Sequence, residues 1–497
     1  MNKILTMAAL ALMTAACSND DTNIQTPVEQ PAKSEGIPFT ATISIGENAM
    51  TRALTEDATN NQIVPTWVAG EKVALIHNGV NDEMSVASVS GGVATITGTI
   101  TGSPTTGDAV TIIYPSTAAD GTTGNVKANL LAAQDGTLAT IAANYDVRKG
   151  TGTMKVSGTT SLNGNVSLTN LNAIFKFTLQ DLSAAAKSAT EFKVSDNSGN
   201  VMTTVTLGSA SDVLYVVLPA MTKGTYWFNA TIDSKPYIAK ATTAAATEAG
   251  KYYQTTVKMA TLGDLMGQDG KFYANADAIT APTKAIGVIG YLGNDATTEA
   301  IANGGGHGLV LCLKDAESGV AWSTEYVSKF SGQEVTSVDG LKRTENVSGY
   351  TNTATLTADA VTAAKYPAAK AAKEYTTLAA PTGTTGWFLP SAQQWVKMIE
   401  GLGALEENSI TWQNWFDTNH TAADKWETAL SKAGSGNYDS MTSSKLYFWS
   451  SSEYSDDGAV VLVVDATGTG SGVGFLWNGF NKDQNFSNRR VRPVLAF

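Results

Sequence analysis

The stretch YFWSSSEYS at residues 447–455 and the stretch RRVRPVLAF at residues 489–497 frame the most informative part of this chain. Between them, aromatic and aliphatic residues are interleaved with Gly, Ser and Asn. Rigid aromatic side chains beside small, adaptable polar ones are typical of recognition surfaces. We interpret the two framing stretches as scaffold and the residues between them as a surface for binding rather than for catalysis.

The whole chain is long, acidic and poor in charged residues. It has 497 residues, a formal net charge of -12 and 16% charged residues. Its length predicts about three or four domains. The negative charge excludes a long-range attraction to nucleic acid or to anionic lipid. We therefore expect neutral or basic partners and no nucleic acid.

The first residues have the pattern of an export signal. Lys3 precedes an apolar run at residues 4–13 that is too short to cross a bilayer as a helix, and small residues then lead to Cys17. This resembles a bacterial lipoprotein signal peptide over residues 1–16, with Cys17 as the lipidation site and an outer-membrane lipid anchor. An ordinary secretory signal is the alternative. An acidic, polar linker is expected over residues 17–36.

Residues 37–262 are dominated by short alternating apolar runs separated by turn residues. Examples are KVALI at residues 72–76 and VTIIY at residues 110–114. Such runs predict strands, and their close spacing predicts β-sandwiches. We expect one sandwich over residues 37–160 and a second over residues 161–262.

Residues 263–497 have a mixed pattern. Ser391 is the predicted N-cap of a helix that runs to Glu400, with Gln394 completing a capping box and Gly401 ending the helix. A second helix is expected from about residue 422 to 432. This part of the chain is therefore predicted to be an α+β domain.

Few residues in the sequence suit catalysis or metal binding. Cys312 lies in the apolar run GLVLCL and is predicted to be a small buried hydrophobic residue. Apart from Cys17 there is no other cysteine, and the histidines are His77, His307 and His420, so neither a zinc site nor a histidine-rich metal centre is expected. Motifs of serine hydrolases, zinc proteases and phosphate loops are absent. We predict no enzyme, no cofactor and no metal.

Residues from about 37 to 260 resemble the fimbrillin family of type V pilus proteins. The resemblance is carried, in chain order, by the lipoprotein start, TRA at residues 51–53, WVAGEKV at residues 67–73 and the strand at residues 214–219. It implies two transthyretin/Ig-like β-sandwich domains and proteolytic processing between Arg52 and Ala53 by an arginine-specific protease. It also implies that processing removes the first strand and that a neighbouring pilin subunit fills the groove by donor-strand addition. An ordinary loop arginine is the alternative for Arg52.

Residues 263–497 resemble the C-type-lectin-like domains of bacterial surface proteins, including the variable proteins of diversity-generating retroelements. The motifs that carry this resemblance are GWFLPS at residues 386–391 leading into Trp395, WSSSEY at residues 449–454 and VRPV at residues 491–494. The resemblance implies a variable region over residues 447–497. We expect the large aromatic residues Trp387, Trp395 and Trp449 to be scaffold, and Arg492 to pair with a carboxylate such as Glu453.

The predicted ligand-binding residues lie between the two framing stretches. They are Val460, Leu462, Val464, Phe475, Trp477, Asn478, Phe480, Asn481, Asn485, Phe486, Asn488 and Arg490. For Val460, Leu462 and Val464 a core strand buried on both faces is the alternative. Residues 477–479 read Trp-Asn-Gly where calcium-binding lectins of this fold have Trp-Asn-Asp, which weakens the case for calcium.

Together these features predict a mainly β cell-surface adhesin with two fimbrillin sandwiches and a C-type-lectin-like domain. We expect a type V pilus tip subunit at the fimbrium tip, because residues 263–497 follow the fimbrillin-like part and prevent it from donating its last strand. Its partners would be the neighbouring pilin and a protein or glycan on host or other cells. The alternative is a permanently anchored surface-binding lipoprotein of the outer membrane that is not assembled into pili.

Overall fold

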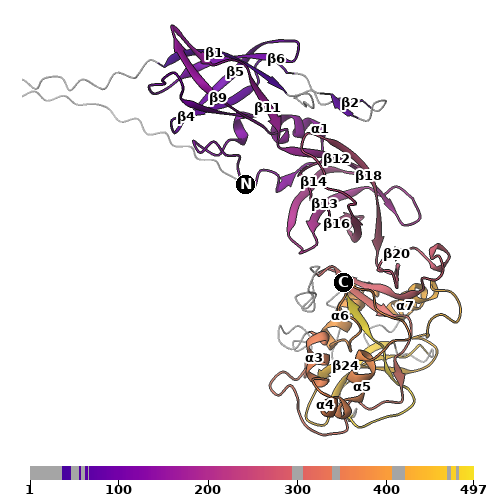
Figure 1. Cartoon of the computed structure of the whole chain (residues 1–497). Coiled ribbons are helices and arrows are strands. Elements are labelled where there is room, and N and C mark those ends of the chain that lie inside the picture. Colours follow the sequence, from indigo (N-terminus) through magenta and orange to yellow (C-terminus); the bar gives the residue numbers. More distant parts are fainter. Residues whose placement is uncertain are drawn as a thin grey trace, which may run out of the picture.

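The computed structural model describes residues 36–45, 55–57, 62–64, 67–293, 306–337, 348–405, 420–466, 472–476 and 481–497. Three bodies follow one another along the chain and form an arc, from indigo through magenta to orange and yellow in Figure 1. In the part of the chain that is described, no helix combines the length and the apolar character needed to span a membrane.

The first body is a barrel-like sandwich. Its sheet has the order β10-β1-β11-β9-β7-β4-β5-β6, and additional pairings of β1 with β6 and of β10 with β9 close it. The strands are β1 (Ile37–Ile45), β4 (Lys72–His77), β5 (Val80–Ser90), β6 (Val93–Ile100), β7 (Ala109–Tyr114), β9 (Arg148–Ser157), β10 (Thr159–Leu162) and β11 (Val166–Asn170). Since β10 and β11 belong to this sheet, the first body extends to Asn170, beyond the predicted boundary at residue 160.

Two connections leave the barrel and contact the second body. One carries a two-stranded hairpin of β2 (Thr55–Asp57) and β3 (Gln62–Val64). The other carries short elements: η1 (Ser116–Ala118), β8 (Ala133–Gln134), α1 (Leu138–Thr140) and the π-helical turn η2 (Ile141–Tyr145). The buried Gln134 carboxamide donates to the carbonyl of Val217 at 2.7 Å and accepts from its N–H at 2.9 Å. The connection between β7 and β9 of the barrel is therefore attached to the second body by hydrogen bonds, in addition to the direct chain link from β11 to β12.

The second body is an eight-stranded sheet in the order β15-β12-β18-β17-β16-β13-β14-β8. Its strands besides β8 are β12 (Asn172–Asp181), β13 (Ala189–Asp196), β14 (Val201–Ser211), β15 (Val213–Pro219), β16 (Thr225–Ile232), β17 (Lys235–Thr242) and β18 (Tyr252–Thr261). Period-two alternation points Phe175, Phe177, Phe192 and Phe228 into one core, where their rings contact one another.

In its described residues, the third body contains two five-stranded sheets and the longer helices. One sheet has the order β20-β19-β21-β22-β28, and the other has the order β23-β27-β24-β25-β26. The strands are β19 (Leu265–Gly267), β20 (Phe272–Tyr273), β21 (Ala285–Leu292), β22 (Gly308–Cys312), β23 (Glu317–Ser318), β24 (Leu446–Glu453), β25 (Ala459–Val464), β26 (Val473–Leu476), β27 (Arg489–Val491) and β28 (Val494–Ala496). The helices are η3 (Ala276–Ala278), α3 (Gly349–Leu356), α4 (Ala360–Lys365), α5 (Pro367–Lys373), α6 (Ala392–Glu400) and α7 (Thr421–Ser431).

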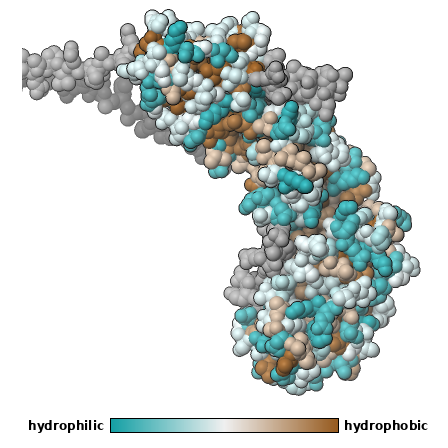
Figure 2. All heavy atoms as spheres, in the orientation of Figure 1, coloured by the Kyte–Doolittle hydropathy of each residue, from teal (hydrophilic) through white to brown (hydrophobic). Residues whose placement is uncertain are grey.

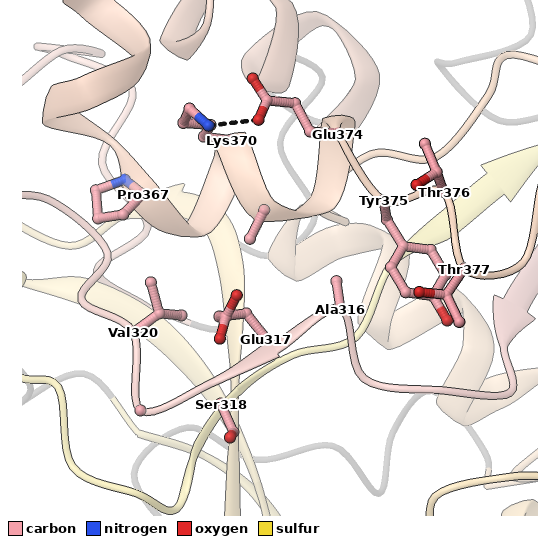
Figure 3. Close-up of a pocket in the computed structure, with 12 residues that line it drawn as sticks. Ala316, Glu317, Ser318, Val320, Pro367, Lys370, Glu374, Tyr375, Thr376 and Thr377 are labelled. Atoms are coloured by element: carbon pink, nitrogen blue, oxygen red, sulfur yellow. Dashed lines mark hydrogen bonds and ion pairs between the residues drawn. The ribbon is translucent and has the colours of Figure 1, made fainter.

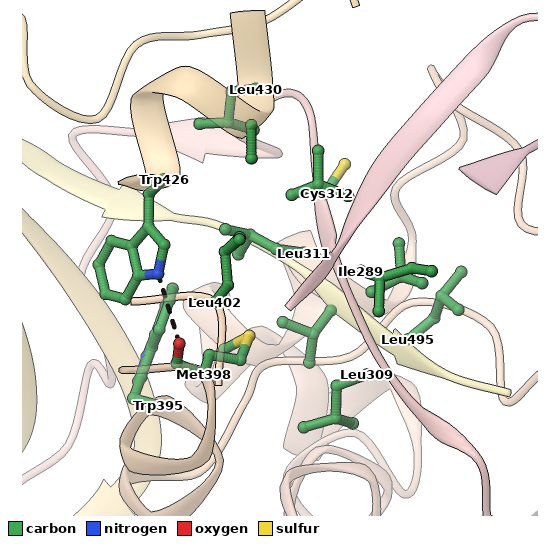
Figure 4. Close-up of a cluster of buried hydrophobic side chains, with 14 of the residues drawn as sticks. Ile289, Leu309, Leu311, Cys312, Trp395, Met398, Leu402, Trp426, Leu430 and Leu495 are labelled. Carbon is green, nitrogen blue, oxygen red and sulfur yellow. Dashed lines mark hydrogen bonds between the residues drawn. The ribbon is translucent and has the colours of Figure 1, made fainter. Parts of the chain in front are cut away.

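The two helices expected from the sequence are confirmed. The Ser391 side chain accepts from the N–H of Gln394, the Gln394 side chain accepts from the N–H of Ser391, and Gly401 is the C-cap of α6. Trp395 on α6 and Trp426 on α7 are fully buried, and the Trp426 indole donates to the carbonyl of Met398 at 3.4 Å (Figure 4). Helices α3 to α5 were not predicted, because their Ala- and Thr-rich sequences lack a clear apolar stripe.

The second and third bodies share a hydrophobic cluster. Trp227 of β16 stacks on His307 with ring centroids 3.8 Å apart, and its ring lies 6.2 Å from that of Phe497. The C-terminal end of β28 therefore lies at this junction, where Figure 1 marks the letter C.

Candidate functional site

Strand β1 closes the barrel of the first body. It pairs antiparallel with β6 from Ile37 opposite Ile100 to Ser44 opposite Val93. On its other side it pairs in parallel with β10 and then with β11. Without β1, one edge of β6 would lose its hydrogen-bonding partner. The edges of β10 and β11 that pair with β1 would lose theirs as well.

The side chains of β1 alternate between core and solvent. Phe39, Ala41 and Ile43 are 1%, 7% and 0% exposed and belong to the barrel core, whereas Thr40 and Thr42 are exposed. Affinity in strand addition comes from main-chain hydrogen bonds and specificity from alternate side chains in pockets. Another strand could replace β1 if it offered free main-chain N–H and C=O groups and apolar side chains at every second position.

The residues predicted for lipidation and processing, Cys17, Arg52 and Ala53, lie outside the described residues. The described chain places β1 up to Ile45 and β2 from Thr55. Arg52 therefore lies in the connection that follows the closing strand.

In the third body, the structure corrects the prediction for Val460, Leu462 and Val464. These residues lie on β25 and have no exposed surface. The intervening Val461 and Val463 are equally buried, because β25 lies between β24 and β26 and is covered on both faces. The three side chains are part of the core rather than of an exposed binding face.

The remaining predicted ligand-binding residues have different positions. Phe475 lies on β26 opposite Leu462. Trp477, Asn478 and Phe480 lie outside the described residues. The segment before β27 carries Asn481, Asn485 and Phe486, which are exposed, with Phe486 61% exposed, and Asn488, which is half-buried. Arg490 is half-buried and lies on β27 itself. Three of these five residues, Asn481, Asn485 and Phe486, are thus exposed on one segment.

A buried ion pair that the sequence did not predict holds this segment. The Lys482 ammonium lies 2.7 Å from the Glu453 carboxylate, and both side chains are fully buried. The same carboxylate accepts from the N–H groups of Lys329 and Phe330 at 2.9 and 2.8 Å. Lys482 was missed because it stands in an Asn-rich polar run, where a lysine is usually exposed.

Arg492 has a different partner from the one predicted. Its Nε donates to Oδ1 of Asp315 at 2.6 Å, and its other nitrogens donate to backbone carbonyls, including those of Cys312 and Asp439. Glu453, the predicted partner, is bound to Lys482 instead. Burial raises the pKa of Asp315, and the Arg492 guanidinium opposes this effect.

Cys312 is fully buried, as predicted. Burial raises the pKa of its thiol to about 12, so the nucleophilic thiolate is not formed at neutral pH. Across the described ranges, no group of His, Cys, Asp and Glu is arranged to hold a metal ion.

A polar cavity of about 510 Å³ lies between β23 and α5. Glu317 and Ser318 lie on the strand side, and Lys370 pairs with Glu374 along the helix (Figure 3). Tyr375, Thr376 and Thr377 complete the lining. The sequence did not indicate this cavity because α5 was not predicted.

A second cavity, of about 460 Å³, lies where the first barrel adjoins the second sheet, and brown atoms gather there in Figure 2. Its apolar lining includes Leu171 and Val201, which are 38% and 58% exposed.

Comparison with known proteins gives matches among solved structures alone. No protein-family model matches the chain. No curated protein matches it. A fimbrial protein from Bacteroides ovatus is 16% identical, with 93% of this chain and 99% of that chain covered and a TM-score of 0.33.

Two further solved structures cover less of the chain. A putative cell adhesion protein from Bacteroides ovatus is 10% identical over 46% of this chain and 95% of its own, with a TM-score of 0.28. The tip fimbrial protein Mfa3 from Porphyromonas gingivalis, with C-terminal truncation, is 10% identical over 42% of this chain and 82% of its own, with a TM-score of 0.22. The chain is thus similar to fimbrial and putative cell-adhesion proteins, at TM-scores too low to transfer a function.

Proposed function

We propose that this chain is a cell-surface adhesin that joins a type V pilus as its tip subunit. In this proposal, an arginine-specific protease cuts between Arg52 and Ala53, β1 leaves the first barrel, and a neighbouring pilin donates a strand in its place. The observation that carries the proposal is that β1 is the closing strand of the barrel, with main-chain pairing on both sides and alternate side chains in the core.

The burial of β28 supports a position at the tip. Val494, Leu495 and Ala496 have no exposed surface, and β28 pairs with β22 inside the third body. This strand is therefore not available to a neighbouring subunit. The chain accepts a strand through its first barrel and ends the row of subunits.

The third body is the proposed binding domain, with a C-type-lectin-like fold and a target that is a protein or a glycan. The exposed segment with Asn481, Asn485 and Phe486 supports this role, because an exposed aromatic side chain flanked by amides is typical of recognition surfaces. Variation of this segment by a retroelement, and acylation of Cys17 before processing, belong to the same proposal.

The test is to sequence the N-terminus of the protein recovered from cells and to determine by mass whether lipid is attached. We expect an N-terminus at Ala53 without lipid. Acylated Cys17 on all of the material would contradict the proposal and support a permanently anchored binding lipoprotein. In parallel, an Arg52→Ala variant should fail to join pili.

A further inference from the structure

The connection between β1 and β4 contacts the second body through the side chain of Glu56. Within this connection, β2 and β3 form their own two-stranded sheet. Glu56 is the middle residue of β2, and its carboxylate accepts hydrogen bonds from side chains of the second body. A residue of the first body's connection is thus held by a different domain.

Both oxygens of the Glu56 carboxylate are used. The Lys176 ammonium donates to them at 2.8 and 2.9 Å. The hydroxyl of Tyr215 donates to Oε2 at 2.6 Å, and the hydroxyl of Tyr252 donates to Oε1 at 2.9 Å. The Gln254 carboxamide adds a longer bond to Oε1 at 3.2 Å.

The donors are placed by the register of the second sheet. Lys176 on β12 lies opposite Tyr215 on β15 and opposite Gln254 on β18. Tyr252 precedes Gln254 by one full pleat and so points to the same face. Because three adjacent strands supply the donors, the site is organised by the sheet itself.

The environment favours the charged pair. The Glu56 and Lys176 side chains are 16% and 22% exposed, so the pair is partly shielded from water. Hydrogen bonding from Lys176 lowers the pKa of Glu56, and the bond to Glu56 raises the pKa of Lys176. Charge-assisted bonds of this kind are stronger than neutral ones.

We propose that Lys176, Tyr215, Tyr252 and Gln254 form a carboxylate-binding site for Glu56, and that this carboxylate clasp controls how fast an arginine-specific protease cuts after Arg52. The inference rests on the proposed function, which assigns the cut to Arg52. A protease must hold extended chain on both sides of the bond that it cuts, so cleavage follows the population in which that chain is free. Arg52 lies just before β2, and the clasp holds β2 on the second body.

The experiment uses the purified full chain and an arginine-specific endoprotease, with mass spectrometry to follow the product that begins at Ala53. Glu56→Gln and Lys176→Met should each be cut after Arg52 at least about tenfold faster than the unchanged chain, since each removes charge-assisted bonds. The double variant should be cut no faster than the faster single variant, because both changes break one clasp.

The matched control is Lys193→Met. Lys193 pairs with Glu191 at 2.7 Å on the same sheet, but both side chains are more exposed, at 38% and 37%. Its cleavage rate should stay within about twofold of the unchanged chain. Thermal unfolding of each variant separates release of the clasp from unfolding of the second body.

Equal or slower cleavage after Arg52 in both clasp variants, or no cleavage there, would overturn the proposal. The proposed function fails by a different result. If the clasp variants are cut faster but the cut protein takes up no strand from a pilin, the proposal about the clasp is supported and the proposed tip function is contradicted.

Discussion

β1 and β28 each complete a sheet, but their side chains have different surroundings. β1 alternates between buried and exposed residues, as Phe39 and Thr40 illustrate, so one face is in the core and the other in solvent. Every residue of β28 is fully buried. A strand with a solvent face can be replaced by another strand of the same alternation, whereas a strand covered on both faces is part of the core.

The residues next to the two strands extend this contrast. Arg492 lies just before β28 and is fixed by Asp315 and by backbone carbonyls. After β1 comes the connection with Arg52, and its next described anchor is Glu56 of β2, which is bound by Lys176 of the second body. In our proposal, these differences make the first barrel an acceptor of a strand and the third body a closed domain.

The largest expected change in stability tests whether Arg492 holds β28 in the third body. Arg492→Ala should lower the free energy of unfolding of the third body by about 3 to 5 kcal/mol, because it removes the closest cation from the buried Asp315 carboxylate and the donors to the carbonyls of Cys312 and Asp439. Urea unfolding followed by tryptophan fluorescence measures this. The matched control is Arg490→Ala, whose side chain is 30% exposed and lies 3.6 Å from Asp315. A loss below about 1 kcal/mol in Arg492→Ala, no larger than that in Arg490→Ala, would mean that β28 is not held by Arg492.

The next prediction concerns the core face of β1. Ile43→Ala should destabilise the first barrel by about 2 to 5 kcal/mol, because it removes a fully buried side chain. Thr42→Ala, on the exposed face of the same strand, should change stability by less than about 0.5 kcal/mol. Calorimetry of the unprocessed chain gives both values. Similar effects at both positions would remove the contrast between the two faces of β1.

A pH experiment tests the junction at the end of β28. The N–H of His307 donates to the carbonyl of Phe497 at 2.8 Å. Burial, with Lys240 nearby, lowers the pKa of His307 from its ordinary 6.5 to about 4. Between pH 6.5 and 4, His307 binds a proton in the unfolded chain but not in the folded chain. The free energy of unfolding is therefore unaffected by the protonation of His307 above pH 6.5 and decreases as the pH falls towards 4.

The size of this effect is at most about 3 kcal/mol. His307→Phe should flatten the fall in stability between pH 6.5 and 4, relative to the unchanged chain. Thermal unfolding across this range, compared between the two proteins, measures the difference. The same pH dependence in both proteins would show that His307 is not shielded at the junction.

The smallest expected effect on stability is at the proposed binding segment. Phe486→Ala should change the free energy of unfolding by less than about 0.5 kcal/mol, because Phe486 is 61% exposed. Binding to target cells should weaken by about tenfold or more if Phe486 is an anchor of the recognition surface. Val464→Ala is the opposite case, with a loss of stability expected from its burial. Unchanged binding by Phe486→Ala would exclude this residue from the surface.

Features that depend on near neighbours could be predicted from the sequence. Ser391, Gln394 and Gly401 mark the ends of α6 through hydrogen bonds within a few residues of each other. The burial of Cys312 followed from its apolar run, and Trp387, Trp395 and Trp449 are buried as expected for large aromatic residues. These signals are local, and so one sequence is enough to reveal them.

Partners that are distant in sequence were decided by the tertiary structure. Alternation did not reveal whether Val460, Leu462 and Val464 face solvent, because only the packing of both faces of β25 determines that. Arg492 pairs with Asp315 rather than Glu453 because Lys482 already occupies Glu453. The described donors to Glu56 are all distant in sequence, and they become neighbours of one another through the register of β12, β15 and β18. Periodicity and capping are encoded by adjacent residues, whereas ion pairs between distant segments depend on how the sheets are assembled.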